Sequence, residues 1–245
     1  MTVLVVLACA VLGADYSTAS VHVLTEAVAT AHRTYDLDLA QALLPVLEQR
    51  VNGGGTEGEE DVRQLLAEDA LLVASLLRNV YEHSDTNTAQ KRELGQAIDA
   101  AAASGFSALG ALPDTSEKHR IMADFYTMMM RTKFKGSTYE EAMETEGDRA
   151  LELDPDNPKA LITKSRRKLF AETNHGGDFQ AGLAMVNRAM ELDPNDAGAY
   201  ILRGLAYERH DMPDKAIADW QRALEINPEA TPAREYLERL GMKGK

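Results

Sequence analysis

Two similar turns constrain the fold of this chain more than any other feature of its sequence. The turns LDPND and EINPEA place Pro194 and Pro228 34 residues apart. Between these prolines, apolar and small residues recur at helical spacing in two blocks, which predicts two helices joined by a short turn. The first block holds Tyr200, Gly204 and Tyr207, and the second holds Ala216, Trp220 and Ala223. Small residues let helices approach closely and large ones fill the remaining space, so we expect these side chains to be structural.

The order of these residues resembles the tetratricopeptide repeat (TPR) family, whose pattern is W-x2-L-G-x2-Y…A-x3-F…P. Its Trp, Gly, Tyr, Ala, Phe and Pro positions hold Tyr200, Gly204, Tyr207, Ala216, Trp220 and Pro228, in that order. The Leu position departs from the pattern, because Arg203 stands there. The resemblance extends over residues 117–241 and is specific over 157–230. It implies a right-handed stack of antiparallel helix pairs, with a concave groove that is lined by the first helix of each pair and binds peptides or helices.

Two further units precede this repeat. Pro155 and Pro194 bracket one with five extra residues, which fall around 171–178 between its two expected helices. In the unit before it we expect a helix over 121–135, and residues 136–142 resemble the turn between the helices of a degraded repeat. Residues 231–240 are expected to form a capping helix with a polar outer face. The motif HGGD at 175–178 is similar to an insert in exported bacterial TPR proteins, including the T-component of TRAP transporters.

The N-terminal half shares with these repeats only the length and order of its expected helices. Two short amphipathic patterns occupy residues 21–49, a longer one occupies 59–83, and an Ala-rich helix is expected over 88–109. We therefore predict an all-α, right-handed superhelical TPR-like solenoid of about five helix pairs with a C-terminal capping helix. Residues 15–112 would be degenerate TPR-like pairs, and residues 113–241 would be the TPR repeats with their cap.

The first fourteen residues carry no charged side chain and include the single cysteine of the chain, Cys9. An apolar stretch of this length is too short to span a bilayer and is typical of a signal peptide, with cleavage after Ala14. The prediction is a periplasmic or secreted protein without stable membrane insertion after leader removal. A buried first helix in a cytoplasmic protein and a lipid anchor on Cys9 are the alternatives.

The charge and the motif content limit the classes of function. The formal net charge is −13, and an acidic surface repels phosphate backbones, so nucleic acid is not an expected partner. No catalytic nucleophile motif, phosphate-binding loop or metal-ligand spacing occurs in the sequence. We therefore expect a protein that is not an enzyme and that carries no cofactor and no metal.

The family resemblance also implies which side chains face the groove. The predicted groove residues are Arg131, Lys135, Lys159, Ile162, Arg166, Phe170, Ile201 and Leu205. Arg131 and Arg166 occupy equivalent repeat positions, and guanidinium groups suit carboxylates, so one hypothesis is a basic groove for an acidic segment or C-terminus of a partner. The alternative is that these cations pair with Asp and Glu on neighbouring helices, as exposed charges commonly do.

The predicted function is that of a non-enzymatic scaffold or adaptor, which binds a peptide or partner protein in its concave groove. The alternative is a periplasmic small-molecule-binding accessory protein of a transporter. That alternative predicts a closed apolar cavity where the Ala-rich helix at 88–109 meets the Met-rich helix at 121–135. A fully packed junction between these helices would count against it.

Overall fold

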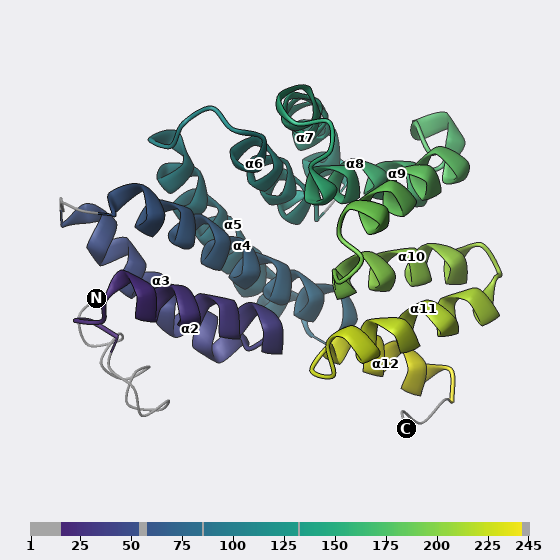
Figure 1. Cartoon of the computed structure of the whole chain (residues 1–245), viewed down its shortest axis with the longest axis horizontal. Coiled ribbons are helices and arrows are strands. Elements are labelled where there is room, and N and C mark those ends of the chain that lie inside the picture. Colours follow the sequence, from purple (N-terminus) through teal and green to yellow (C-terminus); the bar gives the residue numbers. More distant parts are fainter. Residues whose placement is uncertain (1–15, 54–57, 85, 132, 242–245) are drawn as a thin grey trace. The chain divides into compact units, whose positions relative to one another are not determined.

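The computed structural model describes residues 16–53, 58–84, 86–131 and 133–241, without the side chains of residues 83, 133–137 and 174 (Figure 1). The predicted leader, residues 1–14 with Cys9, lies outside the described residues. Every regular element in these ranges is helical, which confirms the predicted fold class. The elements are α2 (Val21–Thr34), α3 (Leu37–Asn52), α4 (Glu59–His83), α5 (Thr88–Gly110), α6 (Ser116–Met129), α7 (Lys133–Leu153), α8 (Pro158–Phe170), the 3₁₀ helix η1 (Thr173–His175), α9 (Phe179–Leu192), α10 (Ala197–Arg209), α11 (Pro213–Ile226) and α12 (Thr231–Arg239). None of the described helices is both long and apolar enough to cross a membrane.

The chain divides into two compact units. Unit 1 comprises Met1–Asp114 and Ile121–Met143, and unit 2 comprises Thr115–Arg120 and Glu144–Lys245. The boundary between the units therefore passes through α6 and α7. Residues 121–143, which the repeat pattern assigns to the C-terminal repeats, make their contacts in unit 1.

Helix α4 is the central helix of unit 1, because it packs against α2, α3 and α5 (Figure 1). The apolar faces of these helices meet in one core, whose fully buried members include Leu24, Leu43, Leu47 and Ile98. A capping box fixes where α5 begins. The side chain of Asn87 accepts a hydrogen bond from the backbone N–H of Gln90, and the side chain of Gln90 accepts one from the backbone N–H of Asn87.

The C-terminus of α6 is set by Arg78 on α4. Its Nη1 donates to the carbonyl oxygens of Met128 at 3.0 Å and Met130 at 2.9 Å. The last carbonyls of a helix lack helical partners, so a cation placed there satisfies them and complements the helix dipole. Helix α6 therefore ends at Met129, and α7 runs from Lys133 through the expected turn. The prediction of a helix over 121–135 followed by a turn at 136–142 is wrong.

The junction between α5 and α6 is closed by the ring of Phe125, which is fully buried. A Cβ atom built on Gly105 would lie 2.1 Å from Cζ of Phe125, so the ring occupies the space above this glycine. Phe106 adds an aromatic contact, with 5.3 Å between its ring centroid and that of Phe125. This packing gives no support to a ligand cavity between the Ala-rich and the Met-rich helix.

Unit 2 is built from consecutive helix pairs, α8 with α9 and α10 with α11, and α12 packs against α11 (Figure 1). The N-termini of α8, α9 and α10 are capped by the side chains of Asn157, Asp178 and Asp196. The insert at residues 171–178 lies between α8 and α9, as predicted, and forms η1 and a turn. The predicted capping helix is α12.

Small residues meet large ones inside these pairs, as the repeat pattern predicts. A Cβ atom on Gly204 of α10 would lie 2.4 Å from Nε1 of Trp220 on α11, and Trp220 is fully buried. In the preceding pair, a Cβ atom on Gly182 of α9 would lie 2.8 Å from the side chain of Leu169 on α8. Both glycines are therefore required by the close approach of two helices.

Candidate binding groove

The predicted groove of unit 2 is carried by one face of α8 and one face of α10. Ile162, Arg166 and Phe170 follow each other at intervals of four residues, so they share a face of α8. Ile162 is 8% exposed and Ile201 on α10 is 9% exposed, so both side chains belong largely to the core. Phe170 and Leu205 are half-buried, and they are the two predicted apolar groove residues with surface left for a partner.

The run Lys164-Ser165-Arg166-Arg167-Lys168 on α8 holds four cations, and two of them, Lys164 and Arg167, pair with acids on α7. Lys164, whose side chain is 11% exposed, contacts Glu144 and places its Nζ 2.7 Å from Oδ1 of Asp148. Its aliphatic stem lies across Gly147, where a Cβ atom would come within 2.5 Å of Cδ. Arg167 pairs with Glu144 at 3.3 Å and also donates to the carbonyl oxygen of His175 at 3.0 Å. For these two cations the structure supports the alternative of ion pairing within the protein.

Arg166 differs from Lys164 and Arg167 in the same run. Its side chain is half-buried, and its Nε is buried without a hydrogen-bond partner among the residues that the structure describes. Within the same residues, no carboxylate forms an ion pair with its guanidinium. A buried guanidinium nitrogen without a partner is unfavourable, because burial removes water and nothing replaces it. Arg166 is therefore the basic groove residue best placed to gain from an incoming anion.

Lys159 lies near the N-terminus of α8, with a side chain that is 61% exposed. Its Nζ is 3.9 Å from Oε1 of Glu117 on α6, a carboxylate that is also paired with Arg120. Burial acts to raise the pKa of Glu117, but the charge and hydrogen bonds of Arg120, the charge of Lys159 and a hydrogen bond from Asn157 together lower it below its usual value. Lys159 thus shares its anion with Arg120 and stays largely solvated.

Arg131 lies in unit 1, and its side chain is only 5% exposed. Its Nη2 is 2.7 Å from Oδ2 of Asp99 on α5, and its guanidinium lies over Gly95, where a Cβ atom would be 3.4 Å from Nε. This ion pair inside unit 1 favours a structural role for Arg131 over contact with a partner. The side chain of Lys135 lies outside the described residues.

The sequence reasoning did not identify the acidic residues that neutralise the basic run. Glu144 and Asp148 are four residues apart on α7, so both reach the same neighbouring helix. This i, i+4 spacing of acids, placed one helix before a basic run, is the sequence signal that could have indicated the pairing.

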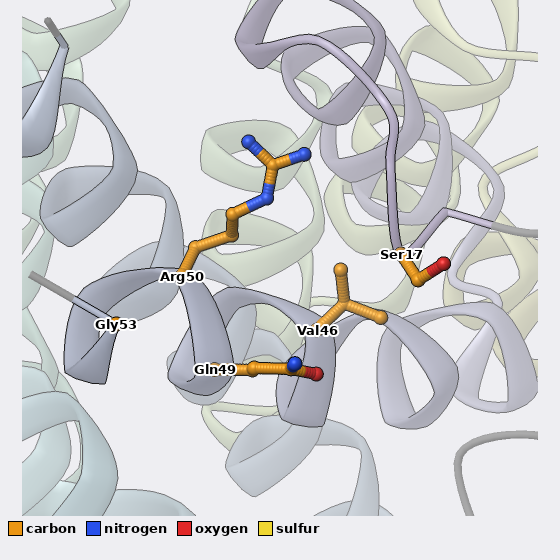
Figure 2. A pocket seen from close by; sticks show the side chains of 5 residues that line it. All are labelled: Ser17, Val46, Gln49, Arg50 and Gly53. Atoms are coloured by element: carbon orange, nitrogen blue, oxygen red, sulfur yellow. The ribbon is translucent and has the colours of Figure 1, made fainter. Parts of the chain in front are cut away.

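Unit 1 also contains a pocket of about 220 Å³, lined by Ser17, Val46, Gln49, Arg50 and Gly53. Figure 2 shows that four of these residues come from the C-terminal part of α3 and its end, while Ser17 faces them from the segment before α2. The guanidinium of Arg50 donates to the carbonyl oxygen of Ala19, so its charge is already bonded to the protein. The volume is below the range of about 300–1,000 Å³ that is usual for small-molecule sites.

Comparisons with known proteins agree with this architecture. Residues 197–229 match the tetratricopeptide repeat family. Among solved structures, a thermophilic TPR protein of Thermus thermophilus is similar in fold, with a TM-score of 0.58 and 15% sequence identity, over 89% of this chain and 100% of that one. A search of curated proteins finds no match. The prediction of a TPR fold is thus confirmed, whereas the resemblance to exported proteins and to the TRAP T-component stays a prediction.

Proposed function

We propose that this TPR-fold protein is a non-enzymatic interaction scaffold, which holds an acidic segment of a partner protein on the groove face of α8 and α10. TPR folds in general serve as protein-interaction scaffolds, so the proposal adds the site and the chemistry of the partner. The observation that carries it is Arg166, a half-buried residue whose Nε is buried without a hydrogen-bond partner among the described residues, and whose guanidinium forms no ion pair with a carboxylate there.

The chemistry of the partner follows from what Arg166 lacks. A carboxylate can accept two parallel hydrogen bonds from a guanidinium, and such charge-assisted bonds are the strong ones. Lys164 and Arg167 cannot respond in the same way without giving up Glu144 or Asp148. One carboxylate on Arg166, rather than a broad run of acids on the whole basic stretch, is therefore the expected contact.

Affinity would come from apolar contacts beside this ion pair. Phe170 lies one helical turn beyond Arg166 on the same face of α8, and its side chain is half-buried. Leu205 is half-buried on α10, a helix that packs against α8. A partner segment with an acidic residue flanked by an aromatic or aliphatic residue fits these two features.

The test uses short fluorescent peptides in which Asp or Glu alternates with Leu and Phe, and a second set in which Lys replaces every acid. Binding to the full chain is followed by fluorescence anisotropy. We expect the acidic set to bind and Arg166→Ala to weaken that binding about 10- to 100-fold, which corresponds to roughly 1.4–2.8 kcal/mol. Amidated peptides distinguish an internal acid from a free C-terminus.

Arg188→Ala on α9 is the matched control, because it removes the same charge from an exposed residue that pairs with two surface acids, Asp156 and Glu191. This variant should bind the acidic peptides like the wild type. Equal binding by the wild type and Arg166→Ala would refute the groove assignment, and preference for the Lys-containing set would refute the acidic partner.

Export of the chain is a separate proposal, supported by the uncharged residues 1–14 that end at Ala14. The full sequence is expressed in a bacterium, and the mass of the protein in the periplasmic fraction is measured. We expect a mature chain that begins at Asp15. An intact chain found only in the cytoplasm would refute the proposal.

A further inference from the structure

Asp69 is a carboxylic acid in the apolar core of unit 1. It lies in the middle of α4 with an exposed fraction of 0%, and neither of its carboxylate oxygens has a hydrogen-bond partner within the described part of the chain. The residues one turn before and after it, Leu65, Leu66, Leu72 and Val73, are buried in the same core. Because α2, α3 and α5 all pack against α4, the acid is surrounded by packed helices instead of solvent.

The charged side chains around this position lie at the surface or are bonded elsewhere. On α2 the exposed charged or titratable residues are His22, Glu26, His32 and Arg33, and Asp38 on α3 and Arg92 and Glu93 on α5 are exposed as well. The other charged side chains have partners of their own. On α3 and α5 these pairs are Glu48 with Ser104, Arg50 with Ala19, Lys91 with the ring of Tyr81, and Asp99 with Arg131. On α4 they are Arg63 with Glu59, Glu68 with Gln64, and Arg78 with Glu82 and the end of α6, and Asp124 on α6 is half-buried. Among the described residues none of them bonds to Asp69.

Asp69 contrasts with the other buried carboxylate of comparable depth. Asp219 in unit 2 is 5% exposed, and the guanidinium of Arg203 holds both of its oxygens. Buried charges in proteins are normally paired in this way, because an unpaired one loses its hydration without compensation. The neutral acid loses far less on burial, so the packed core around Asp69 is compatible with the protonated form and not with the anion.

We propose that the packing of α4 depends on the protonation of Asp69. The closed core of unit 1 holds the neutral acid, and loss of the proton opens the contacts of α4 with its neighbouring helices. The proton leaves to water from the carboxyl group, and the resulting carboxylate gains hydration only when α4 separates from the core. Unit 1 is therefore a segment whose opening increases as pH rises.

Burial raises the pKa of Asp69 well above its usual value. The stabilising contribution of the proton is thus fully present below the pKa of the unfolded chain, near 3.9, and is lost as pH rises through the pKa of the folded state. Between these two values, the opening equilibrium constant increases about tenfold for each pH unit, because the open state releases one proton that the closed state keeps.

The experiment measures hydrogen exchange of the α4 amides in the full chain between about pH 4.5 and 8. After correction for the intrinsic exchange rate, the opening constant of the wild type should rise with pH relative to that of Asp69→Asn, which cannot ionise, by up to about tenfold per pH unit until the pH reaches the pKa of the folded state. Glu60→Gln, an exposed acid in the first turn of the same helix, is the control and should keep the wild-type profile. Parallel profiles for the wild type and Asp69→Asn would overturn the proposal.

A measurement on the wild type alone keeps the proposal testable if Asp69→Asn fails to fold. The carboxyl carbons of the Asp residues are labelled with ¹³C, and their chemical shifts are followed with pH. Asp69 should retain the chemical shift of a neutral acid at pH values well above about 3.9, the usual pKa of an aspartic acid. Ionisation of Asp69 in that usual range would overturn the proposal as firmly as parallel exchange profiles.

Discussion

Arg203 on α10 binds Asp219 on α11 with two hydrogen bonds, from Nε to Oδ2 at 2.8 Å and from Nη2 to Oδ1 at 2.7 Å. Arg203 stands where the TPR pattern has Leu, and its guanidinium also lies 5.7 Å and 5.8 Å from the ring centroids of Tyr200 and Tyr207. The one departure from the repeat pattern is therefore balanced by a second polar residue on the partner helix. An ion pair here replaces the apolar contact that the pattern would supply.

Replacing Arg203 by Leu should destabilise unit 2, although it restores the residue type of the family. The carboxylate of Asp219, whose side chain is 7% exposed, would remain buried without a partner. Because the arginine side chain is 20% exposed, we expect a loss of roughly 2–3 kcal/mol, below the 3–5 kcal/mol that is typical of fully buried pairs. Urea unfolding followed by the fluorescence of Trp220, the single tryptophan of the chain, measures it in unit 2.

The double replacement Arg203→Leu with Asp219→Leu tests the cause. Removing both partners leaves no buried charge, so most of the lost stability should return. A double variant that is as unstable as the single one would contradict the pairing explanation and point to packing around the two tyrosines.

Gly204→Ala should destabilise the same helix pair by steric overlap. The added Cβ atom would lie 2.4 Å from Nε1 of Trp220, a ring that is fully buried and donates to the carbonyl oxygen of Ile201 at 3.3 Å. The indole cannot move without breaking this hydrogen bond, and we expect a cost of about 1–3 kcal/mol in the free energy of unfolding. Gly110→Ala is the control, since nothing lies within 4 Å of its added Cβ atom. A loss for Gly110→Ala equal to that for Gly204→Ala would contradict the steric explanation.

Local signals in the sequence were sufficient for most of the fold. The small and large residues at Gly204 and Trp220 identified the α10–α11 pair, and Pro155 and Pro194 bracketed the α8–α9 pair. The end of α6 was not predictable in this way, because the cation that caps it, Arg78, is about fifty residues away in sequence. A helix end fixed by a tertiary contact leaves no mark in its own segment.

The candidate site was predictable only as a set of residue types. The basic run at 164–168 stands out in an acidic chain, but which of its cations are neutralised depends on the face that α7 turns toward α8. Arg166 could therefore be separated from Lys164 and Arg167 only with the helices in place.

Arg78→Leu should loosen the end of α6 more than the rest of unit 1. The variant keeps the apolar contacts of the side-chain stem but leaves the carbonyl oxygens of Met128 and Met130 without their cation. Hydrogen bonds to charged groups contribute about 1.5–3 kcal/mol, and since this side chain is 19% exposed we expect roughly 1–2 kcal/mol. Hydrogen exchange of the last turn of α6 should accelerate by about tenfold or more. Glu82→Gln, which removes only the exposed ion pair of Arg78, should leave that exchange unchanged.

Glu117 gives unit 2 a pH dependence opposite in sign to that of Asp69 in unit 1. Its pKa is lowered, because Arg120, Lys159 and Asn157 outweigh the effect of burial. A lowered pKa contributes stability above the pKa of the unfolded chain, near 4.3, and the contribution is lost as pH falls through the folded value. The stability difference between the wild type and Glu117→Gln, measured through Trp220 fluorescence, should therefore shrink below about pH 4. Glu152→Gln, which removes a carboxylate that is 67% exposed and paired with Arg149, is the matched control. A difference for Glu117→Gln that stays constant from neutral pH to strongly acidic pH would mean that the carboxylate of Glu117 gains nothing from its cations.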